Sequence, residues 1–231
     1  MKHWMLLLFL CAPIAARLQQ VDTVYLKRLY DRCIDMDENK ADSVAWYAGF
    51  ISKEAARLKF DKGDVLSLRL HGIAEDLRGN YDSALVYYLH SLDAARKLHS
   101  RRYEISALND LGYIYVNTKQ PAKAKDVYLQ CARLSRQGDY SHNVVSSYVN
   151  LGGIYNQLNQ PDSALVFLNE GLAIAKKHND QDGIHSIYNN IGNVYFRKND
   201  FARALPYFQG NFQYHLSTAD SGNIWLAELN L

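Results

Sequence analysis

Small, apolar and aromatic residues recur along this chain at intervals of 40 residues. The clearest marker is a glycine, which is found at Gly72, Gly112, Gly152 and Gly192. In the last three units an apolar residue precedes the glycine, and a tyrosine follows it three positions later. Every unit has an alanine twelve positions after the glycine and a tyrosine, leucine or phenylalanine sixteen positions after it. Such a strict long period predicts one supersecondary unit stacked on copies of itself.

The spacing within each unit predicts two helices, which we name helix A and helix B. Positions −4, −1 and +3 relative to the glycine fall on one stripe of a helix, and positions +12 to +19 form a second stripe. Small residues at the glycine and at +12 let the two axes approach closely. Gly79, Asn159 and Asn199 occupy the turn between the helices, where these residue types tolerate the left-handed conformation. We therefore predict four helical hairpins, at residues 65–104, 105–144, 145–184 and 185–224.

Two flanking segments continue the pattern in a weaker form. Residues 17–64 contain an apolar stripe between Val24 and Cys33 and a second helix start at Asp42, which predicts a degenerate N-terminal hairpin. A terminal repeat is expected to deviate, because one of its faces meets water. Residues 225–231 align with the start of the preceding helix A and predict a further helix A. Their apolar composition indicates either a solenoid that continues beyond this segment or a short helix that packs on another molecule.

The pattern of an apolar residue, glycine and tyrosine, followed by alanine and an aromatic residue, resembles the tetratricopeptide repeat. The residues that carry it best are Leu111, Gly112, Tyr115, Ala124 and Tyr128 in the second unit and Ile191, Gly192, Tyr195, Ala204 and Phe208 in the fourth. The resemblance implies an all-α superhelical solenoid of stacked antiparallel helix hairpins. The period exceeds the about 34 residues of that repeat, and the proline that usually closes helix B is missing. We expect a longer helix B and a longer connecting loop to accommodate the difference.

The resemblance also implies a binding surface for a protein or peptide partner. In the resembled family helix A lines a concave groove through positions −6, −3, +1, +4 and +5 relative to the glycine. The polar and aromatic residues at these positions are Ser106, Asn109, Tyr113, Asn117, Ser146, Asn156, Gln157, Ser186, Asn189, Asn193, Phe196 and Arg197. Amides can donate to and accept from a peptide backbone, and aromatic side chains supply anchors. The alternative is that these residues only solvate an exposed face.

A carboxylate-binding use of that groove, known in the resembled family, is not favoured. It needs lysine and arginine at the groove positions, and here Arg69 and Arg197 stand there, in distant units.

The residue pattern does not favour catalysis, a metal site or a cofactor. It contains no glycine-rich phosphate loop, nucleophile elbow or zinc-ligand spacing. His71 and Glu75 replace apolar repeat residues and could form an acid–base pair, but the favoured interpretation is a partly exposed edge of a weakly packed first unit. Residues 35–46 begin like a calcium loop, but Lys40 replaces its glycine and Trp46 its glutamate. We predict that the chain is not an enzyme.

The charge balance does not favour nucleic acid as a partner. Lysine and arginine total 26 against 24 aspartates and glutamates, a net charge of +2. The local basic run at residues 96–102 is interpreted as a solvated loop, with an acidic partner as the alternative. Many of the 17 tyrosines fall at core positions of the repeat, so packing accounts for them. Cys131 stands at a small core position and is predicted to be a buried free thiol.

The N-terminus predicts export from the cytoplasm. Two basic or polar residues precede an apolar run at residues 5–16, which is too short for a bilayer span and ends in two alanines. We predict a signal peptide at residues 1–16, a secreted or periplasmic location and no membrane span in the mature segment. A lipoprotein modified at Cys11 and an uncleaved anchor are the alternatives.

An export signal followed by long repeats of this kind resembles the extracytoplasmic sensor regions of some bacterial membrane regulators. In those proteins a membrane span and an output domain follow the repeats. Two functions therefore stand side by side, an exported interaction scaffold and the sensor region of a membrane-bound regulator. The encoding gene beyond codon 231 separates them, because a regulator requires an apolar span of about 20 residues there.

Overall fold

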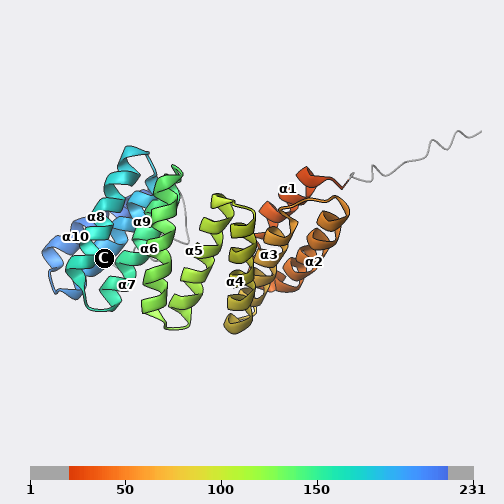
Figure 1. The fold of residues 1–231 in the computed structure, drawn as a ribbon. Coiled ribbons are helices and arrows are strands. Elements are labelled where there is room, and N and C mark those ends of the chain that lie inside the picture. The colour runs from red at the N-terminus through yellow and green to blue at the C-terminus, as the bar shows by residue number, and fades with distance from the viewer. Residues whose placement is uncertain (1–20, 218–231) are drawn as a thin grey trace, which may run out of the picture.

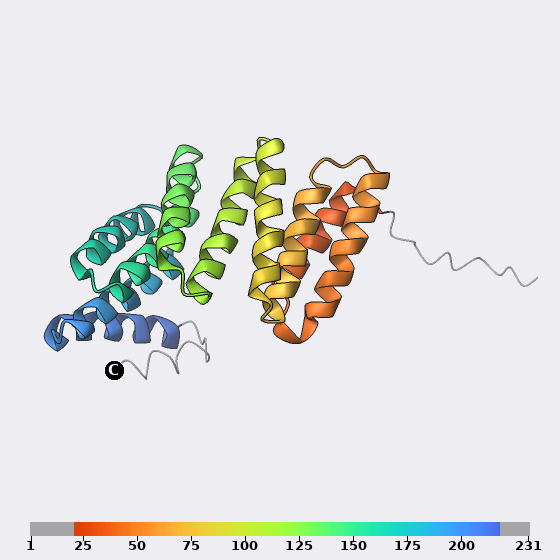
Figure 2. The ribbon, with the colours of Figure 1, turned by 60° about the horizontal axis from the view of Figure 1, so that its bottom comes forward.

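The computed structural model describes residues 21–217, which are helical almost throughout. Its helices are α1 (Thr23–Cys33), α2 (Ala41–Arg57), α3 (Gly63–Leu77), α4 (Tyr81–Lys97), α5 (Arg101–Asn117), α6 (Pro121–Gln137), α7 (Ser141–Gln157), α8 (Pro161–Lys177), α9 (Gln181–Arg197) and α10 (Phe201–Ser217). A short 3-10 turn, η1 (Glu38–Lys40), precedes α2. The helices follow one another in chain order along a row (Figure 1). Figure 2 shows that the row twists, because the last helices run across the direction of α3 to α6.

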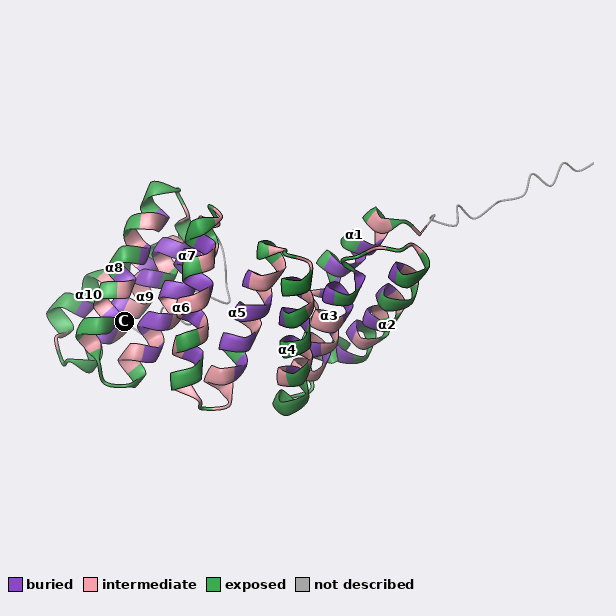
Figure 3. Ribbon diagram, in the orientation of Figure 1, coloured by how far each residue is buried: buried purple, intermediate pink, exposed green. Residues whose placement is uncertain are grey.

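Each helix packs against its neighbours in sequence, so the core is a continuous seam along the row. Figure 3 shows this seam as buried faces turned toward adjacent helices, with exposed faces on the outside. The odd-numbered helices α3, α5, α7 and α9 are the predicted helices A, and α4, α6, α8 and α10 are the predicted helices B. The all-α solenoid of stacked hairpins is therefore confirmed.

The backbone repeats every 20 residues, which is half of the sequence period. Every helix from α4 to α10 has 17 residues, and three residues separate each from the next. Each turn from the end of α2 to the start of α10 contains one residue of positive φ, namely Lys59, Gly79, His99, Lys119, Asp139, Asn159, Asn179 and Asn199. In the turn after α5 the Lys119 amide donates to the Val116 carbonyl at 3.0 Å and the Gln120 amide to the Tyr115 carbonyl at 2.8 Å. This is the Schellman motif, and it ends helices A and helices B alike.

The expected accommodation of the long period is therefore wrong. The loop after helix B is as short as the turn inside the hairpin, and helix A is as long as helix B. The 40 residues of the period are divided equally, as two helices of 17 residues and two turns of three. Glycine and asparagine marked three of these turns in the sequence, whereas Lys119 and His99 gave no signal although they adopt the same conformation.

Each repeat glycine lies where its helix A crosses its helix B. A large side chain sixteen positions later in sequence lies directly against it: Tyr88 at Gly72, Tyr128 at Gly112, Leu168 at Gly152 and Phe208 at Gly192. A Cβ atom on Gly112 would lie 2.5 Å from Cζ of Tyr128, a ring that is only 3% exposed. The absence of a side chain at the glycine is therefore what lets the two helices approach.

The first two helices fall within the predicted N-terminal hairpin. Leu26, Leu29 and Cys33 of α1 are buried, whereas Val24, which the sequence stripe included, is 51% exposed. Cys33 and Cys131 are both buried free thiols, and desolvation raises the pKa of Cys33 to about 11. The predicted signal peptide at residues 1–16 and the predicted further helix at residues 225–231 lie outside the described residues.

Between residues 21 and 217, none of the helices has both the length and the apolar composition that a bilayer span requires.

We expect Gly112→Ala to lower the free energy of unfolding by about 1–3 kcal/mol, because the new methyl group overpacks against the Tyr128 ring. In a Tyr128→Ala background the same substitution should no longer destabilise the chain and should stabilise it by up to about 1 kcal/mol through helix propensity. The two sites thus form a double-mutant cycle. Urea denaturation followed by circular dichroism measures both.

Gly49→Ala is the matched control for this cycle. Gly49 lies inside α2, and an added Cβ there would meet nothing within 4 Å. It should stabilise the chain by up to about 1 kcal/mol through helix propensity alone. An equal loss from Gly112→Ala in both backgrounds would show that the ring contact is not the constraint.

Candidate functional site

A cavity of about 440 Å³ lies on the face formed by the A helices. Residues of α3, α5 and α7 form its walls, Tyr88 of α4 and Tyr128 of α6 reach it from the B helices, and the segment after α1 adds two apolar side chains. The lining residues are Ile34, Met36, Arg69, Ile73, Asp76, Leu77, Tyr88, Asn109, Asp110, Tyr113, Tyr128, Ser146 and Asn150. The cavity thus spans three consecutive repeats.

Three of the predicted groove residues, Asn109, Tyr113 and Ser146, line this cavity. The same five offsets, carried to the first repeat, give Leu66, Arg69, Ile73, Asp76 and Leu77; the last four line this cavity as well, whereas Leu66 lines a smaller neighbouring one. The sequence prediction considered only Arg69 among these, so it missed Asp76 although the signal was present. Asp110 and Asn150 stand at position −2, which the offset rule does not include.

The other predicted residues do not gather at this cavity. Ser106 lines a smaller neighbouring cavity of about 200 Å³ together with Tyr30 and Arg69. Those outside both cavities are Asn117, Asn156, Gln157, Ser186, Asn189, Asn193, Phe196 and Arg197. Arg197 donates to the backbone carbonyl of Asn156 at 2.6 Å and so links α9 to α7. The predicted groove is therefore not one uniform surface.

A charged network bridges the A helices of the first two repeats. Nε of Arg69 donates to Oδ2 of Asp110 at 2.5 Å, and Nη2 donates to Oδ1 at 3.0 Å. Nη1 of the same guanidinium donates to the Tyr30 hydroxyl at 2.5 Å. The Arg69 and Asp110 side chains are only 17% and 15% exposed. Burial alone would lower the pKa of Arg69, but the Asp110 carboxylate outweighs it and raises this pKa.

Tyr88 and Tyr128 supply a polar floor beneath that network. Their rings pass the glycines at the helix crossings, and both residues reach the cavity. Desolvation raises the pKa of each phenol, and the Asp110 charge raises it further, so both hydroxyls are neutral. The third and fourth repeats carry Leu168 and Phe208 at the same position, without a hydroxyl group. The polar floor is consequently a property of the first two repeats.

Asp76 lies in the last turn of α3, on the cavity wall. Among residues 21–217, no hydrogen bond or ion pair engages its carboxylate. Desolvation raises the pKa of Asp76, and repulsion from Asp110 raises it further. The cavity therefore contains one closed ion pair and one carboxylate without a counter-charge.

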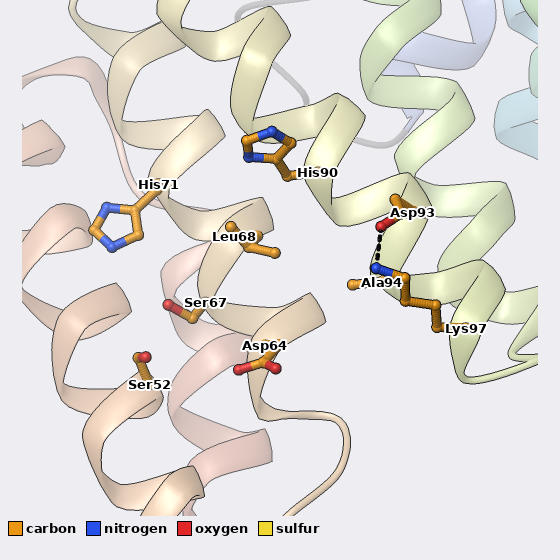
Figure 4. A pocket seen from close by; sticks show the side chains of 9 residues that line it. All are labelled: Ser52, Asp64, Ser67, Leu68, His71, His90, Asp93, Ala94 and Lys97. Atoms are coloured by element: carbon orange, nitrogen blue, oxygen red, sulfur yellow. Dashed lines mark ion pairs between the residues drawn. The ribbon is translucent and has the colours of Figure 1, made fainter.

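A second cavity of about 500 Å³ lies between α2, α3 and α4. Figure 4 shows that its polar side chains are spread around the rim rather than directed at one point, and Asp93 pairs with Lys97 along α4 at 2.6 Å. His71 stacks on Tyr87, with ring centroids 5.1 Å apart, and burial lowers the pKa of its imidazole. The Glu75 carboxylate instead accepts hydrogen bonds from Arg78 and Asn80, the residues that follow the C-terminal end of α3.

The charges of His71 and Glu75 interact, but the hydrogen bonds of the Glu75 carboxylate go to Arg78 and Asn80 and not to the imidazole. Within the part of the chain that the structure describes, no three histidine, cysteine, aspartate or glutamate side chains are grouped so that they could hold a metal ion.

Comparison with known proteins identifies the repeat. One family model described as tetratricopeptide repeat matches residues 64–137 and 103–177, and a second with the same description matches residues 186–214. No curated protein matches the chain.

Several solved structures share the fold at low sequence identity. One is a putative kinesin light chain from Podospora anserina whose TPR-like repeats are nearly identical to one another. Its sequence identity to this chain is 14% and its TM-score is 0.67, and the match covers 85% of this chain and 97% of the kinesin light chain structure. The apo form of RapI is 12% identical, with a TM-score of 0.71, over 85% of this chain and 72% of its own. A Rap protein complexed with competence and sporulation factor is 16% identical, with a TM-score of 0.67, and the match covers 87% of this chain and 56% of the Rap protein.

We expect Asp110→Asn to lower the free energy of unfolding by about 3 kcal/mol, because it leaves the Arg69 guanidinium buried without a counter-ion. Replacing both partners, Arg69→Met with Asp110→Leu, should restore most of that loss. Tyr30→Phe removes one hydrogen bond and should cost about 1 kcal/mol. Urea denaturation of the four chains measures these differences. A double variant as unstable as the single one would contradict this account of the network.

Proposed function

Because this chain belongs to the tetratricopeptide repeat family, we propose that it is a non-catalytic interaction scaffold that binds an extended partner segment on its A-helix face. The observation that carries the proposal is the cavity that crosses α3, α5 and α7. Its volume of about 440 Å³ falls within the range of ligand sites in proteins.

The lining of the cavity suits a peptide. Asn109 and Asn150 present amide groups, which can donate to and accept from an extended backbone. Tyr113 is 50% exposed at the cavity, so a partner can bury its ring at little entropic cost. Two structures of similar fold support the proposal, since one is a Rap protein complexed with competence and sporulation factor and the other a Rap conjugation gene regulator in complex with the Phr* peptide.

We propose further that the scaffold acts outside the cytoplasm. The support is the N-terminal sequence, in which Lys2 and His3 precede the apolar residues 5–16 and two alanines end the run. A second candidate function is the sensor region of a membrane-bound regulator, which is favoured by the same pairing of an export signal with binding repeats. An apolar span of about 20 residues encoded after codon 231 would support the sensor, and a stop codon there would support the scaffold.

The export proposal predicts a processed N-terminus. Expressed in a bacterial host with a periplasm, the full chain should be recovered from the periplasm with Arg17 as its first residue, as shown by intact mass. Leu7→Arg interrupts the apolar run and should leave the protein unprocessed in the cytoplasm. An acylated Cys11, or a periplasmic protein that retains Met1, would contradict cleavage after Ala16.

The binding proposal predicts an aromatic hot spot at Tyr113. Peptides selected on the wild-type chain from a randomised phage-displayed library should bind Tyr113→Ala at least about tenfold more weakly, because truncation of a central aromatic anchor costs about 2 kcal/mol. Isothermal titration calorimetry gives the affinities. Tyr113 is preferred to Asn109, whose amide oxygen accepts from the Cys131 thiol at 3.2 Å and therefore also contributes to packing.

Trp46→Ala is the matched control for this measurement. Trp46 is 65% exposed on α2 and lies outside the A-helix cavity, so its removal tests the loss of an aromatic surface residue elsewhere. Both variants should retain the helical content of the wild type. Equal affinities of the wild type and Tyr113→Ala would exclude this cavity as the binding site.

A further inference from the structure

The charges of the A-helix cavity are not balanced. Its charged lining residues are Arg69, Asp76 and Asp110. The guanidinium of Arg69 is held by both carboxylate oxygens of Asp110 and by the Tyr30 hydroxyl. Asp76 is left as a carboxylate that no side chain of the described residues neutralises. The electrostatic preference of the cavity is therefore set by Asp76.

The neighbours of Asp76 are suited to a cation rather than to an anion. Hydroxyl oxygens of Tyr88 and Tyr128 and the amide oxygen of Asn150 can accept hydrogen bonds, and the exposed ring of Tyr113 can take a cation on its face. Donors alone would suit an anion, but the one guanidinium of the lining already has its partners.

The apolar part of the lining suits the stem of a long basic side chain. Ile73 and Leu77 of α3 and Ile34 and Met36 of the segment after α1 lie in the same cavity. Lysine and arginine bury their methylene groups along such surfaces while the charged head finds a polar partner. In this cavity the apolar wall suits the methylene groups of such a side chain, and the one unpaired carboxylate suits its charged head.

We propose that this cavity is a specificity pocket for a lysine or arginine side chain of the partner segment, with Asp76 as its counter-charge. The proposal rests on the proposed function, and it names the chemistry of the partner. It is opposite in sign to the recognition of a carboxylate, because Arg69 is occupied within the protein and Asp76 repels an anion.

Two sets of measurements test the pocket. Peptides selected from the randomised phage-displayed library should be enriched in lysine or arginine. In a selected peptide, replacement of the basic residue by norleucine or citrulline should weaken binding to the full chain by about tenfold or more, as expected for loss of a charge-assisted hydrogen bond. Replacement by glutamate should weaken it further.

The protein variants are Asp76→Asn and Asp126→Asn, which change the net charge equally. Asp126 is exposed on α6 and lies outside the cavity, so it controls for long-range electrostatics. Asp76→Asn should reduce affinity for the basic peptide about tenfold while the norleucine peptide binds both proteins equally. Asp126→Asn should bind like the wild type. Circular dichroism and the melting temperature show that each variant is folded.

The pH profile provides a readout that a structural role of Asp76 would not move. A cation binds the ionised carboxylate, so wild-type affinity should fall as the pH drops through the pKa of Asp76, which desolvation and Asp110 raise above its ordinary value. Arg69 stays charged, Tyr88 and Tyr128 stay neutral, and Asp110 is common to both proteins. The profile of Asp76→Asn should therefore be flatter than that of the wild type.

The outcomes separate this inference from the proposed function. Selected peptides that bind at Tyr113 without any preference for a basic residue would overturn the pocket and leave the scaffold standing. Failure of the library to yield any binder would overturn the scaffold itself. Spermidine provides a last comparison. If it displaces the peptide and binds more tightly than the peptide does, the pocket proposal is also overturned, because the site would then serve a small polycation.

Discussion

The structure depends on one packing contact, in which a large side chain of helix B lies directly against a glycine of helix A where the two helices cross. A Cβ on any of the four repeat glycines would lie 2.5 or 2.6 Å from the nearest atom of that side chain. Interior packing leaves no room to relieve such an overlap, and so the crossing fixes how close the two helices lie. Each helix B in turn supports the next helix A, and the geometry of one crossing is transmitted along the row.

The same contact decides where polar chemistry reaches the A-helix face. Tyr88 and Tyr128, the crossing residues of the first two repeats, line the cavity on that face, whereas the third and fourth repeats carry Leu168 and Phe208, which have no hydroxyl group. The A helices of the first two repeats are also joined by an ion pair and not by apolar packing alone. A buried ion pair contributes little net stability compared with apolar residues of the same volume. Both of its side chains line the cavity that α3, α5 and α7 share.

Most of the fold could be predicted from the sequence because the same residue types occur at the same positions in four repeats, so that positions that are weak indicators alone support one another. Turn geometry escaped prediction where Lys119 and His99 adopt the conformation usual for glycine, since local sequence carries no mark of it. The site was predicted only in part. Offsets within a helix identify Asn109 and Tyr113, but they cannot show that the guanidinium of Arg69 finds its partner on the next repeat, a pairing that only the stacking of repeats creates.

The two ends of the solenoid therefore differ in kind although their backbones are alike. In the third and fourth repeats α7 and α9 pack directly together, and Arg197 ties the end of one to the other. Gly153 stands there at the position of Tyr113, with the amide oxygen of Asn190 3.7 Å from where its Cβ would be. The cavity described above lies instead at α3, α5 and α7, where an ion pair bridges the first two A helices. Since the turns from α2 to α10 share one geometry, the difference lies in side chains, both those of the A helices and those at the crossing position of the B helices, where Tyr88 and Tyr128 are replaced by Leu168 and Phe208.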